Sequence, residues 1–139
     1  MSGFRLHPRL ADDCLEVGTL PLCRLLLLKD ARYPWFVLVP EWPDLTEIYQ
    51  LPAPERAQLM EESANLSRCL VELYRPDKLN IAAIGNLVPQ LHLHHVARYQ
   101  ADPAWPHPVW GRLPPLPYAP EVAEARVASM RSALADLLR

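Results

Sequence analysis

Two apolar runs near the start of the chain predict a β-hairpin. Residues 20–29 are rich in leucine, and residues 35–39 form a second apolar run after a short polar turn at 30–34. Runs joined by such a short loop are typical of antiparallel strands, and Pro40 ends the second because proline has no N–H to donate to a ladder. Residues 1–20 mix acidic and apolar positions and predict a short irregular or helical segment.

A long amphipathic helix is predicted over residues 54–75. Pro54 suits the first helical position, and Glu55 puts a negative charge in the first turn. Spacings of three and four along this segment mark one buried helix face, which consists of Leu59, Ser63, Leu66, Leu70 and Tyr74. Pro76 ends the helix.

Two further strands and a second helix complete the pattern. Residues 79–84 and 91–98 predict the strands, with a turn over 85–89 between them, and a proline-rich segment follows at 101–119. The last helix is predicted from about residue 120 to 138, with a stripe of Ala123, Val127, Met130, Leu134 and Leu137. This order indicates an α+β fold with a mostly antiparallel sheet of about five strands, one long helix packed on it and a C-terminal helix.

Length and composition narrow the class of protein. A chain of 139 residues, half of them hydrophobic, predicts one domain with a core at about 14–100, a wrap at 101–119 and the C-terminal helix at 120–138. A net charge of −2 without a basic stripe argues against a nucleic-acid partner. No apolar run approaches the roughly 20 residues that cross a bilayer, so no membrane partner is expected.

Cysteine and glycine usage adds two constraints. Cys14, Cys23 and Cys69 are odd in number and widely spaced, which fits buried thiols in a reducing compartment. The N-terminus also lacks a signal pattern, so we expect a cytoplasmic protein. The chain has 16 prolines and only four scattered glycines, so neither of the usual glycine-rich phosphate loops is present.

The run Gln90-Leu91-His92-Leu93-His94-His95-Val96 carries the candidate chemistry. Successive side chains of a strand alternate between its two faces. One face therefore holds Gln90, His92 and His94, with Arg98 further along, and the other holds Leu91, Leu93 and His95. The leucine face suits packing against a helix, whereas the opposite face carries two histidines about 7 Å apart along the backbone.

Two interpretations of this histidine face involve no nucleotide. His92 and His94 are ordinary half-exposed strand residues, or they are a His-x-His metal pair. The metal interpretation lacks nearby acidic ligands, because residue 97 is alanine and residue 98 is arginine. We therefore expect neither a metal nor another cofactor.

Two other interpretations involve a nucleotide. A neutral imidazole attacks phosphorus through one ring nitrogen when the other is held as a donor to a carbonyl, which makes one histidine a nucleophile. The second histidine then hydrogen-bonds phosphate oxygens or protonates the leaving group, while Arg98 or Asn80 neutralises charge. Alternatively, the same pocket binds a nucleotide without turning it over.

This part of the chain resembles the histidine triad (HIT) family. The family signature is His-φ-His-φ-His-φ-φ, with φ apolar, on a strand that follows an Asn-bearing strand and a short loop. The matching stretches here are Leu79-Asn80-Ile81 and the run from Pro89 to Val96. The resemblance covers about residues 14–100 and is close to a bacterial HIT-like branch that ends in a D-x-x-W-P-x-P-V-W-G-like segment, here Asp102 to Gly111.

The resemblance implies a function and an assembly. HIT members are typically homodimers that hydrolyse or transfer nucleotidyl groups of phosphoramidates or dinucleoside polyphosphates through a covalent nucleotidyl-histidine. Carried over residue by residue, His92 takes the nucleophile position, His94 the third triad position and Gln90 the position of the first histidine. Asn80 matches the polar residue near the ribose or α-phosphate, and Trp35 stands where many members have the histidine of a Pro-Gly-His segment.

Two positions depart from the family pattern. Gln90 donates and accepts hydrogen bonds but cannot change protonation state, so any proton role at that position is gone. His95 replaces an apolar residue and faces the helix, which favours a buried, hydrogen-bonded core histidine. The expected function is a hydrolase or transferase acting on a purine nucleotide or nucleotide conjugate. The alternative is a nucleotide-binding or regulatory protein with little or no turnover.

Residues around the histidine strand add further candidates. Arg98 either clamps phosphate or pairs with Asp102, and Asn86 either brings an amide near phosphate or serves ordinary turn chemistry. The rings of the proline-rich segment either cap a base by stacking or wrap the core, and they belong to Trp105, His107 and Trp110.

Overall fold

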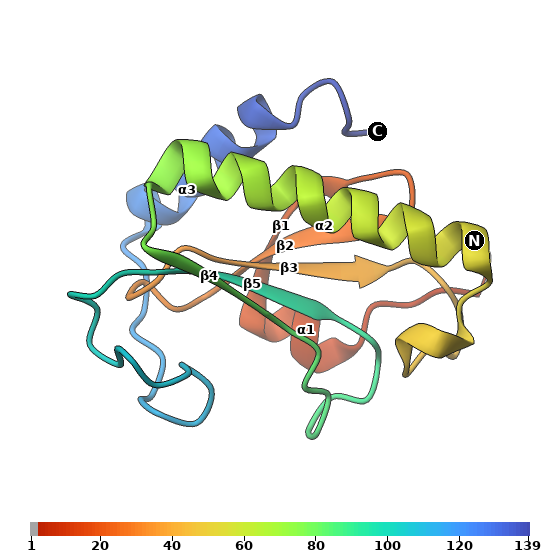
Figure 1. Ribbon diagram of the computed structural model, residues 1–139, viewed down its shortest axis with the longest axis horizontal. Coiled ribbons are helices and arrows are strands. Elements are labelled where there is room, and N and C mark those ends of the chain that lie inside the picture. Colours follow the sequence, from red (N-terminus) through yellow and green to blue (C-terminus); the bar gives the residue numbers. More distant parts are fainter. Residues whose placement is uncertain (1–2) are drawn as a thin grey trace.

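The computed structural model describes residues 3–139 and contains a five-stranded sheet with helices on both faces (Figure 1). The strand order is β1-β2-β3-β5-β4, and every neighbouring pair is antiparallel. The strands are β1 (Cys14–Thr19), β2 (Cys23–Leu28), β3 (Trp35–Pro40), β4 (Lys78–Ala82) and β5 (Leu93–Arg98). The helices are α1 (Pro8–Asp13), α2 (Ala53–Tyr74) and α3 (Pro120–Ala133), with a short 3-10 helix, η1, at Ile48–Gln50. The predicted α+β fold is confirmed.

Helices α2 and α3 lie along one face of the sheet, and α1 lies against the other (Figure 1). The apolar stripe of α2 explains its position, because Leu59, Leu66 and Leu70 are at most 2% exposed. They share a core cluster with side chains of the sheet such as Leu27 and Phe36. Burial of such a stripe is the main source of stability for a helix of this kind.

The opposite face of the sheet carries a second apolar cluster. Val37 and Val96 point to this face and are fully buried. Leu10 of α1 and Val109 of the proline-rich segment pack into the same cluster and are 3% and 4% exposed. Helix α1 before the sheet and the proline-rich segment after it therefore fold back over this face. The same face carries His94.

Residues 14–19 form a strand where the sequence pattern predicts an irregular or helical segment, and that prediction is wrong for this stretch. The register between β1 and β2 shifts between Glu16 and Gly18. Such a bulge breaks the alternation of apolar and polar side chains, so the period-two signal of a strand is missing. A methyl group at Gly18 would lie 2.9 Å from the end of the Leu138 side chain, so a larger residue here would require that side chain to move.

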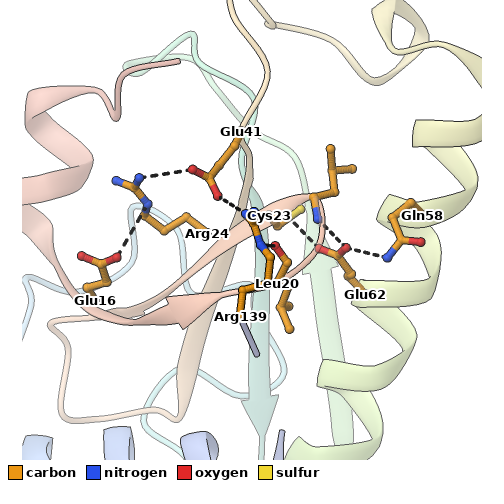
Figure 2. Close-up of polar contacts among 9 residues, drawn as sticks. Glu16, Leu20, Cys23, Arg24, Glu41, Gln58, Glu62 and Arg139 are labelled. Carbon is orange, nitrogen blue, oxygen red and sulfur yellow. Dashed lines mark hydrogen bonds and ion pairs between the residues drawn. The ribbon is translucent and has the colours of Figure 1, made fainter. Parts of the chain in front are cut away.

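A buried carboxylate joins the start of β2 to α2 (Figure 2). Glu62 is 2% exposed, and its two oxygens accept the backbone N–H groups of Leu22 and Cys23, each over 2.8 Å. Gln58 donates its side-chain amide to the same carboxylate over 2.7 Å. These bonds satisfy a charge that is otherwise costly to bury. Burial, reinforced by the Glu62 charge, holds the pKa of the Cys23 thiol well above its ordinary value, so this thiol is unreactive.

The remaining global features concern the thiols and the helices. Cys14, Cys23 and Cys69 are buried free thiols, as the sequence predicts. Within residues 3–139, no helix combines the length and the apolar character needed to span a membrane.

Candidate active site

Strand β5 carries the histidines into the middle of the sheet. It lies between β3 and β4, with His94 opposite Val37 and His95 opposite Phe36. An interior strand is held by ladder hydrogen bonds on both sides, so the directions of these side chains are fixed. His92 lies just before β5, and its ring centroid is 4.9 Å from that of His94. The predicted pairing of these two histidines on one side is confirmed.

His95 points to the helix side of the sheet. It is 0% exposed, its Nε2 lies 2.7 Å from the hydroxyl of Ser63 in α2, and its Nδ1 lies 3.1 Å from the carbonyl oxygen of Leu93. A carbonyl only accepts, so Nδ1 carries the proton and Nε2 accepts the hydroxyl hydrogen. Burial lowers the pKa of His95 to about 4, against the opposing effect of the Leu93 carbonyl. The prediction of a buried, hydrogen-bonded core histidine is confirmed.

His92 has a defined tautomer. Its Nδ1 lies 2.7 Å from the carbonyl oxygen of Gln90, which only accepts, so Nδ1 carries the proton and Nε2 keeps a lone pair. Burial lowers the pKa of His92, the nearby His7 adds to this effect, and the hydrogen bond to the Gln90 carbonyl opposes it. A neutral imidazole with a free Nε2 lone pair is the form that attacks phosphorus.

His94 has the opposite tautomer. The indole N–H of Trp35 donates to Nδ1 of His94 over 2.9 Å, so Nδ1 accepts and Nε2 carries the proton. Burial lowers the pKa of His94 to about 3, and the charges of His92 and His95 add to this effect. His94 is therefore a neutral hydrogen-bond donor at neutral pH. The two neighbouring rings therefore differ at Nε2, which is unprotonated in His92 and protonated in His94.

A cavity of about 330 Å³ opens beside His92. Thr46 contributes a polar group to its wall, and Ile48, Tyr49 and Ile84 contribute apolar ones. These three apolar side chains are 41%, 76% and 43% exposed, so they form an accessible apolar surface next to a histidine. Concave sites of this kind, with a few polar groups on an apolar wall, are typical of small-molecule binding.

The chain matches one protein-family model and several solved structures. A family model described as HIT domain matches residues 11–101. The chain belongs to the HIT family. A histidine triad protein from Marinobacter aquaeolei is 48% identical with a TM-score of 0.94, and the match covers 98% of this chain and 99% of that protein. A histidine triad protein from Bradyrhizobium japonicum is 47% identical with a TM-score of 0.92, covering 94% of this chain and 98% of that one.

A third HIT protein, from Sinorhizobium meliloti, is 38% identical with a TM-score of 0.93, covering 96% of this chain and 99% of that one. No curated protein matches the sequence. The HIT fold is associated with nucleotide binding and with hydrolase or transferase activity, which agrees with a histidine in the wall of a cavity.

In this HIT protein, the side chain of Gln90 holds the N-terminal segment. Its Oε1 accepts the backbone N–H of His7 over 2.8 Å, and its Nε2 donates to the carbonyl oxygen of Arg5 over 2.8 Å. The carboxamide thus forms both hydrogen bonds that a neighbouring strand would form. The backbone carbonyl of the same residue fixes the tautomer of His92. Gln90 therefore positions both the N-terminal segment and the His92 ring.

Trp35 lies behind the histidines rather than on an open binding surface. It is 6% exposed, donates to His94, and meets Trp110 edge to face with ring centroids 5.9 Å apart. Trp110 also packs edge to face on His94 at 5.4 Å. In the structure Trp35 therefore contacts His94 and the proline-rich segment, and its contact with a substrate stays a prediction. Trp110 accordingly wraps the core, one of the two roles that the sequence leaves open.

Arg98 pairs with Asp102, one of the two roles that the sequence leaves open. It is 1% exposed, its Nε and Nη2 donate to the Asp102 carboxylate over 2.8 and 3.0 Å, and its Nη1 donates to Asn80 over 2.8 Å. A bidentate buried pair leaves the guanidinium closed to a ligand. The same network engages the side-chain oxygen of Asn80, whose contact with ribose or phosphate stays a prediction.

The remaining candidates lie outside this network. Asn86 is exposed in the loop between β4 and β5, next to Gly85 in the cavity wall. The guanidinium carbon of Arg98 lies 5.7 Å from the ring centroid of Trp105, and His107 is exposed. Within residues 3–139, no group of three or more His, Cys, Asp or Glu side chains is arranged to hold a metal ion.

Sequence reasoning missed His7 and the wall of the cavity. His7 and Gln90 are 83 positions apart, and no periodicity connects them. Thr46, Ile48 and Tyr49 lie in the connection between β3 and α2, which carries no pattern that singles them out. Only the register of the folded sheet brings these segments to the histidine strand.

Proposed function

We propose that this HIT protein is a nucleotide hydrolase or nucleotidyl transferase that acts at an α-phosphate through a covalent nucleotidyl-His92 intermediate. One observation carries the proposal: His92 lines the cavity, and His94, with its ring centroid 4.9 Å from that of His92, holds the opposite tautomer. His92 offers a lone pair on Nε2, and His94 offers an N–H on Nε2. A nucleophile and a donor for phosphate oxygens are the two groups that displacement at phosphorus needs.

The reaction has two displacements. Nε2 of His92 forms a bond to the α-phosphorus, the bond to the leaving group breaks, and the leaving group departs with the electron pair and takes a proton from solvent. The His92 ring becomes cationic, and the Gln90 carbonyl 2.7 Å from Nδ1 stabilises that charge. A water oxygen then bonds to phosphorus and releases a proton to solvent, while the P–N bond breaks and its electron pair returns to Nε2. During both steps His94 hydrogen-bonds a phosphate oxygen.

The cavity beside His92 supports a nucleoside as the bound half of the substrate. Ile48, Tyr49 and Ile84 offer apolar and aromatic surface to the faces of a base, and Thr46 offers a hydroxyl to polar edges or ribose. The substrates in this proposal are purine nucleotides or nucleotide conjugates, either phosphoramidates or dinucleoside polyphosphates. No residue with a metal or cofactor role is required by the two displacements.

Turnover of adenosine 5′-phosphoramidate tests the proposal. Chelator-treated protein is incubated with this compound and AMP release is followed, with His92→Ala as the test variant. His107→Ala is the matched control, because His107 is an exposed histidine outside the site. We expect AMP release from the wild type and the control and a loss of at least about 1,000-fold in the test variant. Equal or absent release in all three proteins contradicts the enzymatic proposal.

A second candidate is a nucleotide-binding or regulatory protein with little turnover. It is favoured by Gln90, which cannot titrate, and by the burial of His92 and His94, which are each 6% exposed. It predicts AMP or GMP affinity in calorimetry without hydrolysis of the phosphoramidate. Turnover that depends on His92 rejects this candidate.

We also propose that the protein is a homodimer that pairs along β4. Strand β4 is an outer strand of the sheet in residues 3–139, and an unpaired edge readily accepts another strand. Several large apolar side chains are exposed, with Ile81 of β4 48%, Leu87 in the loop after β4 77% and Met60 of α2 65% exposed. We expect a dimer in sedimentation, a monomer for Ile81→Lys and a dimer for Val122→Lys in α3. A monomeric wild type at micromolar concentration contradicts the proposal.

The setting of the protein is a further part of the proposal. Three buried free thiols fit a reducing compartment such as the cytoplasm. The bacterial sources of relatives 38% to 48% identical support placement in a bacterial HIT-like branch.

A further inference from the structure

Two hydrogen-bond acceptors lie in the wall of the cavity that His92 also lines. They belong to the side chains of Thr46 and Glu47, and among the residues that the structure describes in this wall none is a lysine or an arginine. A carboxylate without a neighbouring cation repels phosphate groups and attracts N–H donors. The part of a nucleotide that suits this cavity is therefore a nucleoside whose base presents N–H groups.

The hydroxyl of Thr46 is held as an acceptor. It donates its hydrogen to Oε1 of Gln50 over 3.2 Å, and the same oxygen accepts the backbone N–H groups of Thr46 and Glu47 over 2.9 and 3.0 Å. Glu47 is the N-cap residue of η1 and shares a capping box with Gln50. A hydroxyl whose hydrogen is already donated only accepts, and a carboxylate has about four acceptor positions. This part of the wall therefore offers acceptors to a ligand.

The two purine bases differ in what they present to such a wall. The Watson–Crick edge of guanine has two adjacent donors, N1–H and the 2-amino group, which match the two oxygens of a carboxylate. Adenine has one donor, its 6-amino group, beside the acceptor N1, and a carboxylate repels that acceptor. Tyr49 and Ile84 of the same wall are 76% and 43% exposed and offer surface to the faces of either base. The acceptors, and not the apolar surface, distinguish the two bases.

We infer that Glu47 makes the site selective for guanosine nucleotides, because its carboxylate accepts N1–H and the 2-amino group of the base while the α-phosphate lies at His92. This inference rests on the proposed function, since it concerns the nucleoside half of the same substrate. Glu47 contacts the base and not the reacting atoms. It determines specificity and takes no part in either displacement.

Calorimetry with GMP and AMP tests the role of the carboxylate through Glu47→Gln. Glutamine keeps the size of the side chain and an oxygen for the capping box, but it replaces one carboxylate oxygen with an NH2 donor. We expect the wild type to bind GMP about 10- to 100-fold more tightly than AMP, the size of hydrogen bonds to a charged group, and Glu47→Gln to lose this preference.

A matched control and two outcomes decide the result of this comparison. Glu61→Gln changes an exposed glutamate of α2 outside the cavity wall, and it should keep the preference for GMP. Equal affinities of the wild type for GMP and AMP overturn the inference. An unchanged preference in Glu47→Gln overturns it as well.

Inosine 5′-monophosphate shows which group of the base is recognised. It keeps N1–H and lacks the 2-amino group, so we expect the wild type to bind it about tenfold more weakly than GMP. In Glu47→Gln the difference between these two nucleotides should fall below about twofold, because the 2-amino group has lost its charged acceptor. A difference of the same size in both proteins assigns the 2-amino contact to another residue and overturns the inferred role of Glu47.

Turnover of guanosine and adenosine 5′-phosphoramidates separates this inference from the proposed function. Equal kcat/KM for the two compounds keeps the enzymatic proposal and overturns the inference. A preference for GMP that depends on Glu47, without nucleotide release from either phosphoramidate, overturns the enzymatic proposal and keeps the inference. A wild type that binds neither GMP nor AMP overturns both.

Discussion

The indole N–H of Trp35 donates to Nδ1 of His94 over 2.9 Å, and both side chains are only 6% exposed. This bond makes Nδ1 of His94 the acceptor and leaves the ring proton on Nε2. The Gln90 carbonyl makes the opposite choice for His92 by accepting from its Nδ1. The two neighbouring histidine rings thereby hold their protons on different nitrogens, because their hydrogen-bond partners differ.

Replacement of the tryptophan removes the group that sets the His94 tautomer. Trp35→Phe leaves a buried acceptor without its donor, so we expect a loss of about 1–3 kcal/mol in unfolding free energy. Nitrogen-15 NMR of the histidine rings should then show a mixture of His94 tautomers, with turnover reduced about tenfold. Trp105→Phe is the control, because Trp105 lies over Arg98. A single unchanged His94 tautomer in Trp35→Phe contradicts this account.

The fold follows from sequence patterns that are local. The leucine runs at 20–29 and 35–39 and the stripe of α2 at spacings of three and four coincide with β2, β3 and α2. Strand β1 is not predicted from the sequence, because its bulge interrupts the alternation of apolar and polar side chains. Alternation within β5 was sufficient to separate His94 from His95 and to predict that His95 meets the helix.

The chemistry of the site depends on partners that are distant in sequence. Trp35 and His94 are 59 positions apart, and His7 and Gln90 are 83 apart. Such pairs are set by sheet register and by how the terminal segment folds back, neither of which has a local signature. The role of Arg98 was undecided for a similar reason, because Asp102 and a ligand phosphate are equally suitable partners for a guanidinium until burial is known.

Gln90→His restores the residue of the family signature. In this account the gain of a titratable ring does not compensate for the loss of two bonds to the backbone of Arg5 and His7. We expect turnover of adenosine 5′-phosphoramidate to fall about tenfold and unfolding free energy to fall by about 1–2 kcal/mol. Kinetics and urea denaturation of the variant check both values. A large gain in rate would instead support a binding protein that lost turnover with its first histidine.

The ion pair between Arg98 and Asp102 is expected to act on stability and not on substrate affinity. Their side chains are 2% and 4% exposed, so Asp102→Asn leaves a buried guanidinium without its counter-charge. The expected loss is about 3–5 kcal/mol in unfolding free energy, measured by urea denaturation.

An exposed pair supplies the control for this prediction. Arg9 and Asp13 are 58% and 53% exposed, and Asp13→Asn should cost less than about 1 kcal/mol. Equal effects of the two substitutions, or a raised KM in Asp102→Asn with unchanged stability, would restore the phosphate-clamp interpretation.

Stability should fall on mild acidification because buried histidines resist protonation. The pKa of His95 falls from an ordinary value of 6.5 to about 4 in the folded protein, so the unfolded chain binds more protons between these values. Unfolding free energy therefore decreases as pH falls below about 6.5, by roughly 2 kcal/mol at pH 5 for this one histidine. Above pH 7 the His95 ring is neutral in both the folded and the unfolded protein, so it adds no pH dependence to the unfolding free energy there.

The substitution His95→Asn isolates that contribution. Asparagine does not titrate, so the decrease between pH 7 and pH 5 should be smaller than in the wild type by roughly 2 kcal/mol. His107→Asn changes an exposed histidine and should retain the full decrease. Urea denaturation at the two pH values gives the comparison, and equal decreases in wild type and His95→Asn would contradict burial of a neutral His95.

The central claim is that Nε2 of His92 forms a bond to phosphorus. Rapid mixing with adenosine 5′-phosphoramidate, a quench in base and mass spectrometry of the peptides should find one adenylyl group on the peptide that contains His92. Fragmentation should assign it to His92, and His92→Asn should carry no adenylyl group. AMP release by the wild type with no adduct on His92, or with the adduct on another residue, would contradict the account.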